Sequence, residues 1–152
     1  MKISEALRGV KLIAFDTSPF IYYTEDSPAY VDKMDVIFDL IYADKTQIIT
    51  SIITLTEVLV KPLRIGDIVV ESKYRTLFSS TGKIQLQLVD RAVAERAAVL
   101  RAIYNLKTPD ALQVATALES NCEAFLTNDA GIKRVTEIRV LVLDELELDP
   151  AP

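Results

Sequence analysis

The sequence has no histidine, one cysteine and four glycines in 152 residues, and these scarcities exclude several kinds of active site. Without histidine there is no Ser-His or Cys-His nucleophile pair and no His-ligated zinc site. The glycines are too far apart for a G-x-G-x-x-G motif or for a phosphate-binding loop that ends in G-K-[ST]. Histidine-dependent catalysis and the common nucleotide-binding loops are therefore excluded.

The single cysteine, Cys122, cannot form an internal disulfide, which fits a reducing, cytoplasmic environment. The first ten residues carry Lys2, Glu5 and Arg8 and lack an apolar run long enough for a signal peptide. The longest uncharged stretch, 46–56, is far shorter than the ~20 residues that cross a bilayer, so we expect no membrane association. The formal net charge of −5 argues against binding nucleic acid through bulk charge alone.

What remains is the composition and pattern of one globular α/β domain. Half of the residues are hydrophobic and 26% are charged, which is typical of a chain with a packed core. Strand and helix signals alternate, and this alternation predicts a mostly parallel sheet with helices on both faces. We expect the domain to cover residues 1–143 and the acidic segment 144–152 to be a frayed tail. The predicted strands are 11–16, 47–50, 83–89, 124–127 and 139–143; the predicted helices are 31–43, 53–61, 65–79, 90–104, 108–121 and 132–136.

Capping and breaking residues set several of these boundaries. Ser18-Pro19 indicates a turn or a helix start after the first strand, and Pro62 is expected to end the helix that begins at Ile53. Asp90 and Thr108 are the predicted N-caps of the two later helices, and Pro109 fits the first helical position after Thr108.

Four carboxylates lie at or near strand-to-helix junctions, where ligands bind in open parallel sheets. Asp16 closes the first predicted strand, Asp129 follows the strand 124–127, and Asp110 opens a helix. Glu57 interrupts the apolar run 52–60, where an ionised carboxylate is costly unless it is paired, bound to a metal or directed into a cleft. We expect these four side chains to converge.

A cluster of carboxylates without histidine or cysteine suits a hard divalent cation, because Mg²⁺ prefers oxygen ligands and keeps several waters. Without the metal, like charges raise one another's pKa; with it, a bound water can become the nucleophile in phosphodiester hydrolysis. Metal-dependent nuclease chemistry is the natural interpretation, with Mn²⁺ as a possible substitute.

Each feature also has a purely structural explanation. Asp110 can complement a helix dipole, Asp16 and Asp129 can be turn or capping residues, and Glu57 can point to solvent. Exposed basic pairs such as Lys61 with Arg64, Lys73 with Arg75 and Lys133 with Arg134 are most often solvated surface. Tyr22 and Tyr23 can stack on bases or pack in the core, and Cys122 is interpreted as an inert buried thiol.

Four short motifs occur in order along nearly the whole chain: F-D-T-S at 15–18, L-T-E-V-L at 55–59, T-P-D-A-L at 108–112 and L-T-N-D at 126–129. In this order and at these separations they resemble the PIN-domain ribonuclease family. Each motif is weak alone, whereas the ordered set is specific.

This resemblance implies a PIN-like fold and an endoribonuclease that hydrolyses RNA phosphodiester bonds with metal-activated water, leaving 5′-phosphate and 3′-hydroxyl ends. It implies Mg²⁺ as the cofactor, or Mn²⁺ in its place, with Asp16 and Asp110 as direct ligands. The implied catalytic residues are Asp16, Glu57, Asp110 and Asp129, and the implied supporting polar residues are Ser18, Thr127 and Asn128.

Single-domain members of about this size are similar to the VapC-type toxins of bacterial and archaeal toxin–antitoxin pairs. The resemblance therefore implies a cytoplasmic homodimer that acts on RNA and is silenced by a cognate antitoxin protein.

The chain departs from the family pattern at two positions. Gln113 stands where family helices often carry histidine, and Gly131 stands where many members place another acid. These departures leave substrate choice and auxiliary metal ligands open. The alternatives are a non-catalytic PIN-like module that binds RNA or protein, a housekeeping RNA-processing nuclease, and a metal-dependent enzyme acting on DNA or a small phosphate ester.

Overall fold

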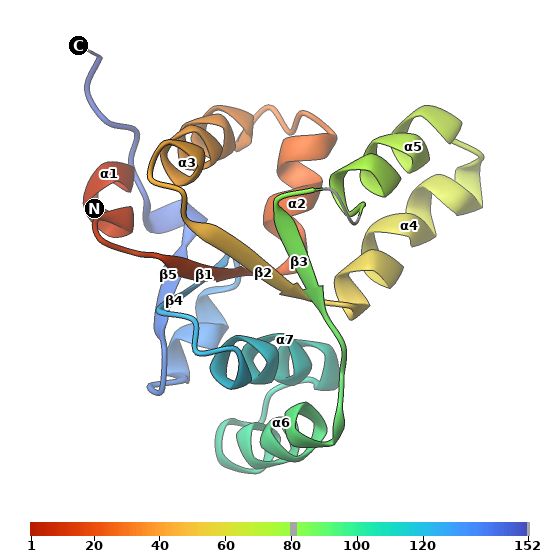
Figure 1. The fold of residues 1–152 in the computed structure, drawn as a ribbon, viewed down its shortest axis with the longest axis vertical. Helices are drawn as coiled ribbons and strands as arrows, with labels where there is room; N and C mark the ends of the chain where they lie inside the picture. The colour runs from red at the N-terminus through yellow and green to blue at the C-terminus, as the bar shows by residue number, and fades with distance from the viewer. Residues whose placement is uncertain (80–81, 152) are drawn as a thin grey trace.

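The computed structural model describes residues 1–79 and 82–151 and contains a parallel sheet with strand order β3-β2-β1-β4-β5 (Figure 1). A bilayer-spanning helix is absent from this described part of the chain. The strands are β1 (Leu12–Phe15), β2 (Gln47–Ser51), β3 (Ile84–Gln87), β4 (Ala124–Thr127) and β5 (Arg139–Val142). The α-helices are α1 (Ile3–Leu7), α2 (Thr17–Thr24), α3 (Val31–Ala43), α4 (Ile53–Ile65), α5 (Ile68–Leu77), α6 (Arg91–Tyr104) and α7 (Thr108–Glu119), with 3₁₀ turns η1 (Ala130–Arg134) and η2 (Leu143–Glu145).

Helices cover both faces of the sheet, so the predicted fold class is confirmed. Alternate side chains of a strand point to opposite faces, and in β1 Ile13 and Phe15 join the core beneath α1, α2 and α3, while Ala14 joins the core with α6 and α7. β4 divides in the same way between Leu126 and Phe125. Figure 1 shows α2 and α3 on one side of the sheet and α6 and α7 on the other.

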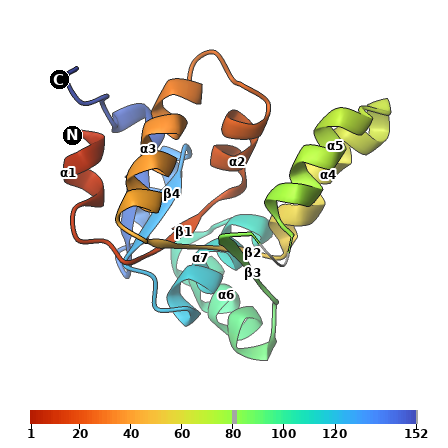
Figure 2. The same cartoon turned by 45° about the horizontal axis from the view of Figure 1, so that its top comes forward.

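Helices α4 and α5 lie side by side and project beyond the sheet as an arm in both views (Figures 1 and 2). Two predicted helix boundaries are wrong here. Helix α4 continues through Pro62 to Ile65. Near the helix end, the N–H that proline lacks costs only one hydrogen bond, and the Pro62 side chain is buried. The predicted helix 65–79 appears as α5 but begins three residues later, because Ile65 still belongs to α4 and Gly66, with a φ of +70°, ends α4 in the left-handed region.

Most other predicted elements appear with small shifts. The helix Val31–Ala43 has the predicted bounds, and the Asp90 carboxylate caps α6 by accepting from the Val93 N–H at 2.9 Å. The N-cap of α7 is Lys107 rather than Thr108, so Pro109 lies in the second helical position. The predicted helix 132–136 is the 3₁₀ turn η1.

The expected fraying of the C-terminal segment does not fit its contacts. Leu146 is buried, and Glu147 pairs with Lys2 through a parallel backbone bridge and a 2.8 Å ion pair. The Asp149 carboxylate accepts from the N–H and the hydroxyl of Ser4. The segment through Asp149 is therefore held beside the start of the chain, and Leu146 belongs to the same core as the buried residues of α1. Pro152, the last residue of the predicted tail, lies outside the described residues.

Candidate active site

Asp16 stands at the carboxyl edge of the sheet, directly after the central strand β1, and is the N-cap of α2. One carboxylate oxygen accepts from the Thr17 N–H at 2.8 Å, and the other accepts from the Thr127 hydroxyl at the end of β4, also at 2.8 Å. Both oxygens are thus held by donors from neighbouring elements. Burial raises the pKa of Asp16 to about 6, and Asp110 and Glu57 add to this increase, while the two hydrogen bonds oppose it.

Asp110 lies half-buried in the first turn of α7, where a carboxylate is favoured by the helix dipole. Its pKa is raised, first by burial and then by the charges of Asp129 and Glu57. Lys107 and Arg134 act in the opposite direction, so cations flank this side of the acids.

Glu57 and Asp129 are more exposed than the other two acids. Glu57 extends from α4, and its Oε1 accepts from the Thr17 hydroxyl at 2.8 Å. Asp129 is the N-cap of η1, where its carboxylate accepts from the Gly131 N–H at 2.8 Å, and its own N–H donates to the Thr127 hydroxyl at 3.0 Å. Gly131, the position of the missing auxiliary acid, thus supplies a backbone donor to Asp129.

The four acids interact electrostatically. The charges of Asp110 and Glu57 raise the pKa of Asp16, and those of Asp129 and Glu57 raise the pKa of Asp110. Within residues 1–79 and 82–151, no group of three or more acids or cysteines has the arrangement of a preformed metal site. The donor set still fits Mg²⁺, which binds through one or two carboxylates and retains several waters.

The three supporting residues differ in their contacts. Thr127 is fully buried and links Asp16 to the backbone of Asp129. Asn128 bonds instead to the Tyr22 hydroxyl at 3.3 Å and to the Asp144 N–H at 2.9 Å, so it joins α2 to the C-terminal segment. Ser18 lies half-buried in the first turn of α2, and in the described part of the chain its hydroxyl bonds to none of the acids.

Sequence reasoning missed a buried set of polar residues behind the acids. It treated Gln113 as a departure affecting substrate choice, yet this side chain is 2% exposed and bonds to threonines of α2 and α4. The signal that could have revealed it is a glutamine within the apolar stretch of α7. Its partners are the hydroxyls of Thr17 and Thr54 and the Ser51 backbone N–H.

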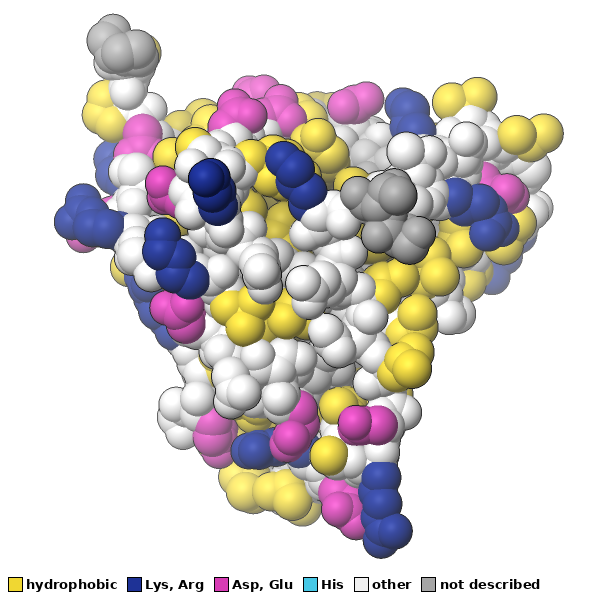
Figure 3. Space-filling model, in the orientation of Figure 1, with side chains coloured by type: hydrophobic (Ala, Val, Ile, Leu, Met, Phe, Trp, Pro, Cys, Tyr) yellow, Lys and Arg dark blue, Asp and Glu magenta, His cyan; other side chains and the backbone are white. Residues whose placement is uncertain are grey.

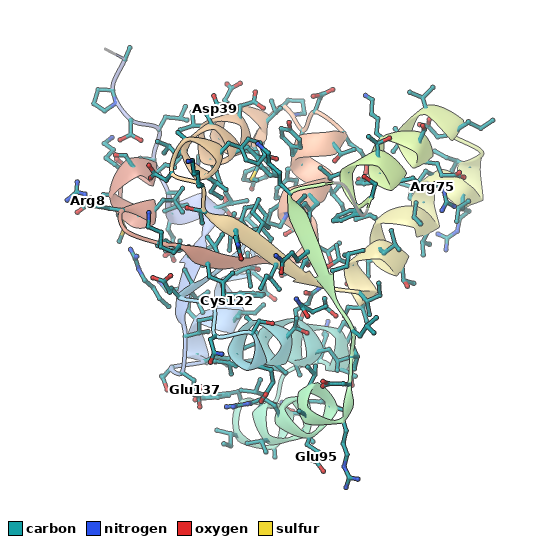
Figure 4. All side chains as sticks on the ribbon, in the orientation of Figure 1. Arg8, Asp39, Arg75, Glu95, Cys122 and Glu137 are labelled. Atoms are coloured by element: carbon teal, nitrogen blue, oxygen red, sulfur yellow. The ribbon has the colours of Figure 1, made fainter. Side chains whose placement is uncertain are left out.

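Other candidate groups contribute to packing. Tyr22 stacks on Tyr30 with ring centroids 4.3 Å apart, and Tyr23 packs against Phe38 at the same distance. Burial raises the pKa of the Cys122 thiol to about 12, which fits an inert thiol close to the end of α7 (Figure 4).

The sequence profile of the PIN domain matches residues 13–138, which include all four acids and the chain from the second residue of β1 through β4 to the residue before β5. The chain belongs to the PIN domain family. Curated protein sequences give no significant match.

Solved structures of toxin–antitoxin systems share this PIN fold. VapBC2 from Rickettsia felis, bound to a promoter DNA fragment, aligns with a TM-score of 0.72 and 18% identity over 86% of this chain and 98% of that chain. A toxin-antitoxin complex from Klebsiella pneumoniae aligns with a TM-score of 0.60 and 25% identity over 86% and 97%. The sarcin-ricin-loop-cleaving toxin VapC20 from Mycobacterium tuberculosis aligns with a TM-score of 0.63 and 17% identity over 84% and 98%.

The PIN family is one of nucleases that use divalent metal ions, and the resemblance to VapC-type toxins inferred from the motifs is confirmed at the level of the fold. The PIN motif positions of this chain occupy the carboxyl edge of the sheet, where ligands of open α/β sheets bind.

Proposed function

We propose that this PIN protein is a metal-dependent endoribonuclease that acts as the toxin of a toxin–antitoxin pair. The observation that carries the proposal is the arrangement around Asp16. A carboxylate buried next to two other acids is unfavourable by itself, and its pKa is raised to about 6. Sites of this kind are retained where function requires the charges together. A divalent cation is the partner that relieves their repulsion.

Asp16 and Asp110 are the residues we propose as direct ligands of Mg²⁺ or Mn²⁺. When bound, the cation supplies positive charge for a phosphate oxygen and lowers the pKa of a water molecule. Asp16 is held for this role by the Thr17 N–H and the Thr127 hydroxyl. Glu57 and Asp129 orient the attacking water and accept its proton.

The proposed substrate is RNA, and the proposed reaction is hydrolysis of a phosphodiester bond. The water oxygen forms a bond to phosphorus, the 3′ oxygen leaves with a proton, and the products carry 5′-phosphate and 3′-hydroxyl ends. Lys107 and Arg134 are exposed beside Asp110 and are suited to contact substrate phosphates.

An antitoxin protein and a second copy of the chain are the proposed protein partners. Large apolar side chains are exposed along the arm of α4 and α5, and Figure 3 shows hydrophobic side chains over this part of the molecule. Monomeric proteins rarely leave such a patch uncovered. The exposed large apolar residues of the arm are Val60, Leu63, Ile65, Ile68 and Val69. The cytoplasm is the proposed location.

Cleavage of a mixed, structured RNA by nuclease-free protein tests the function, with Mg²⁺, with Mn²⁺ and with chelator. The control is Asp16→Asn prepared identically, because asparagine is also a good N-cap and preserves the start of α2. We expect metal-dependent cuts that disappear in the variant. Cleavage retained in Asp16→Asn refutes the site.

The same assay separates the alternatives. A parallel panel of DNA and phosphomonoesters detects a different phosphate substrate. Absence of both cleavage and Mn²⁺ binding favours a non-catalytic RNA- or protein-binding module. Cleavage without toxicity, or without a neighbouring antitoxin gene, favours a housekeeping RNA-processing nuclease.

A further inference from the structure

A buried polar cluster lies directly behind the acids, between β2, α2, α4 and α7. Thr54 is fully buried, and Thr50, Gln113 and Thr17 are only 1%, 2% and 8% exposed. Buried polar groups are costly unless they are hydrogen-bonded, and in the described part of the chain every buried side-chain nitrogen and oxygen has a partner. The cluster therefore forms a fully satisfied hydrogen-bond network, in which the donor and acceptor of each bond can be assigned.

Two backbone groups fix the directions of the hydrogen bonds, because each has only one role: the Phe15 carbonyl accepts and the Ser51 N–H donates. The Phe15 carbonyl can only accept, so the Thr50 hydroxyl, 2.8 Å away, donates its single hydrogen to it. The Thr50 oxygen must then accept from the Thr54 hydroxyl, which lies 2.7 Å away. The hydrogens of Thr50 and Thr54 are thus both committed.

The orientation of the Gln113 amide follows from its surroundings. The Ser51 backbone N–H can only donate, and it faces Oε1 at 3.4 Å. This leaves Nε2 to donate its two hydrogens, one to the Thr54 hydroxyl oxygen at 2.7 Å and one to that of Thr17 at 3.2 Å.

With its oxygen accepting from Gln113, Thr17 has one hydrogen to donate, and it donates this hydrogen to Oε1 of Glu57 at 2.8 Å. In the described part of the chain, Oε2 of Glu57 has no hydrogen-bond partner. One oxygen is thus anchored, and the other is left for a water molecule or a substrate group.

We propose that Gln113 is a positioning residue that acts through Thr17 to hold the Glu57 carboxylate in its working orientation. Helix α7 then has two roles, because Asp110 lies one turn before Gln113: it carries one acid and orients another. The kinetic consequence rests on the proposed ribonuclease function, whereas the orientation of Glu57 does not.

The kinetic test compares Gln113→Met, Thr17→Val and the double variant, all of which replace polar groups with apolar groups of similar shape. We expect each single variant to lower kcat about tenfold with KM within about twofold, because misplacing a catalytic group affects the chemical step. If Gln113 acts through Thr17, the double variant is no slower than either single variant. Multiplied effects, or an unchanged kcat in a folded Gln113→Met protein, overturn the proposal.

A matched control and a second readout separate this proposal from the proposed function. Thr116→Val removes another buried hydroxyl from α7, one that among the described residues bonds only to the Leu112 carbonyl, and is expected to change neither readout. The second readout is the NMR chemical shift of the Glu57 carboxyl carbon at one fixed pH in the metal-free protein. It should move equally in Gln113→Met and Thr17→Val and stay near wild type in Thr17→Ser.

The cleavage assay and the NMR measurement can contradict the two proposals independently. A wild type that cleaves no RNA, with the Glu57 signal moved in both variants, refutes the function and leaves the positioning role standing. An active wild type whose Glu57 signal is unmoved by Gln113→Met refutes the positioning role and leaves the function standing. Should Gln113→Met not fold, Thr17→Val and Thr17→Ser still decide whether the Thr17 hydroxyl orients Glu57.

Discussion

At the scale of single residues, Asp16 makes stability depend on pH. Its pKa in the folded protein is about 6, above the ordinary value of 3.8. The folded state therefore binds more protons than the unfolded state between these values, and stability falls as the pH rises from about 4 to about 6. Well above pH 6, Asp16 is ionised in both the folded and the unfolded state, and its full destabilising effect on the folded state is present.

Asp16→Asn should remove this dependence. We expect the metal-free variant to match wild type near pH 4 and to exceed it above pH 6, by at most about 3 kcal/mol. The gain is reduced because an amide cannot accept from both Thr17 and Thr127. Urea unfolding from pH 4 to 8 measures the difference. Asp39→Asn, at an exposed acid of α3 (Figure 4), is the control: it keeps Asp16, so its stability should fall with rising pH in the same way as that of wild type.

Added metal should reverse the order. A ligand that binds only the folded state stabilises it by RT ln(1 + [L]/Kd), about 2.7 kcal/mol at a hundredfold excess over Kd. We expect Mg²⁺ or Mn²⁺ to raise the melting temperature of wild type well above that of Asp16→Asn in the same buffer. Equal shifts in both proteins would place the metal elsewhere.

At the scale of elements, the arm depends on how α4 ends. Gly66 has a φ of +70°, and a Cβ there would meet no atom within 4 Å, so a substitution affects only the backbone. Gly66→Ala should destabilise the protein by about 1 kcal/mol, and Gly66→Asn by clearly less, because asparagine tolerates the left-handed region. Chemical denaturation distinguishes the two variants; equal costs would contradict this explanation.

The C-terminal segment offers a second test at this scale. Leu146 is 3% exposed, so Leu146→Ala should cost about 2–4 kcal/mol in unfolding free energy. Leu148, two residues later, is 42% exposed, and Leu148→Ala should stay within about 0.5 kcal/mol of wild type. A frayed tail would instead make both substitutions neutral.

How far the sequence predicts the elements depends on whether their signals are local. Helix α3 was predictable because its apolar face repeats at helical spacing, and α6 because Asp90 caps it. The end of α4 was predicted wrongly at Pro62, because the effect of a proline on a helix depends on its distance from the helix end and on its burial. Asp16 and Asp129 could be placed at one edge of the sheet because each follows a strand, whereas Asp110 opens a helix and Glu57 lies inside one. The role of Gln113 was not predictable, since it requires three separate segments to be placed in space.

At the scale of the whole molecule, the central strand β1 is bordered by early and late parts of the chain. Its partner β2 precedes residue 52, whereas its other partner, β4, begins at Ala124. The hydrogen bond between Asp16 and Thr127 crosses this boundary, and Lys2 meets Glu147 in the same way. Contacts of such long sequence separation form late in folding.

This arrangement has a consequence during protein synthesis. A nascent chain that has released β1, β2 and β3 from the ribosome still lacks Asp110, Asp129 and the Thr127 hydroxyl that holds Asp16. Because domains fold from the N-terminus as they emerge, the acidic site closes only when the last strands are made. A chain interrupted before β4 would therefore lack Asp129 and the Thr127 hydroxyl that holds Asp16, so the site proposed for RNA cleavage is complete only when most of the domain has been made.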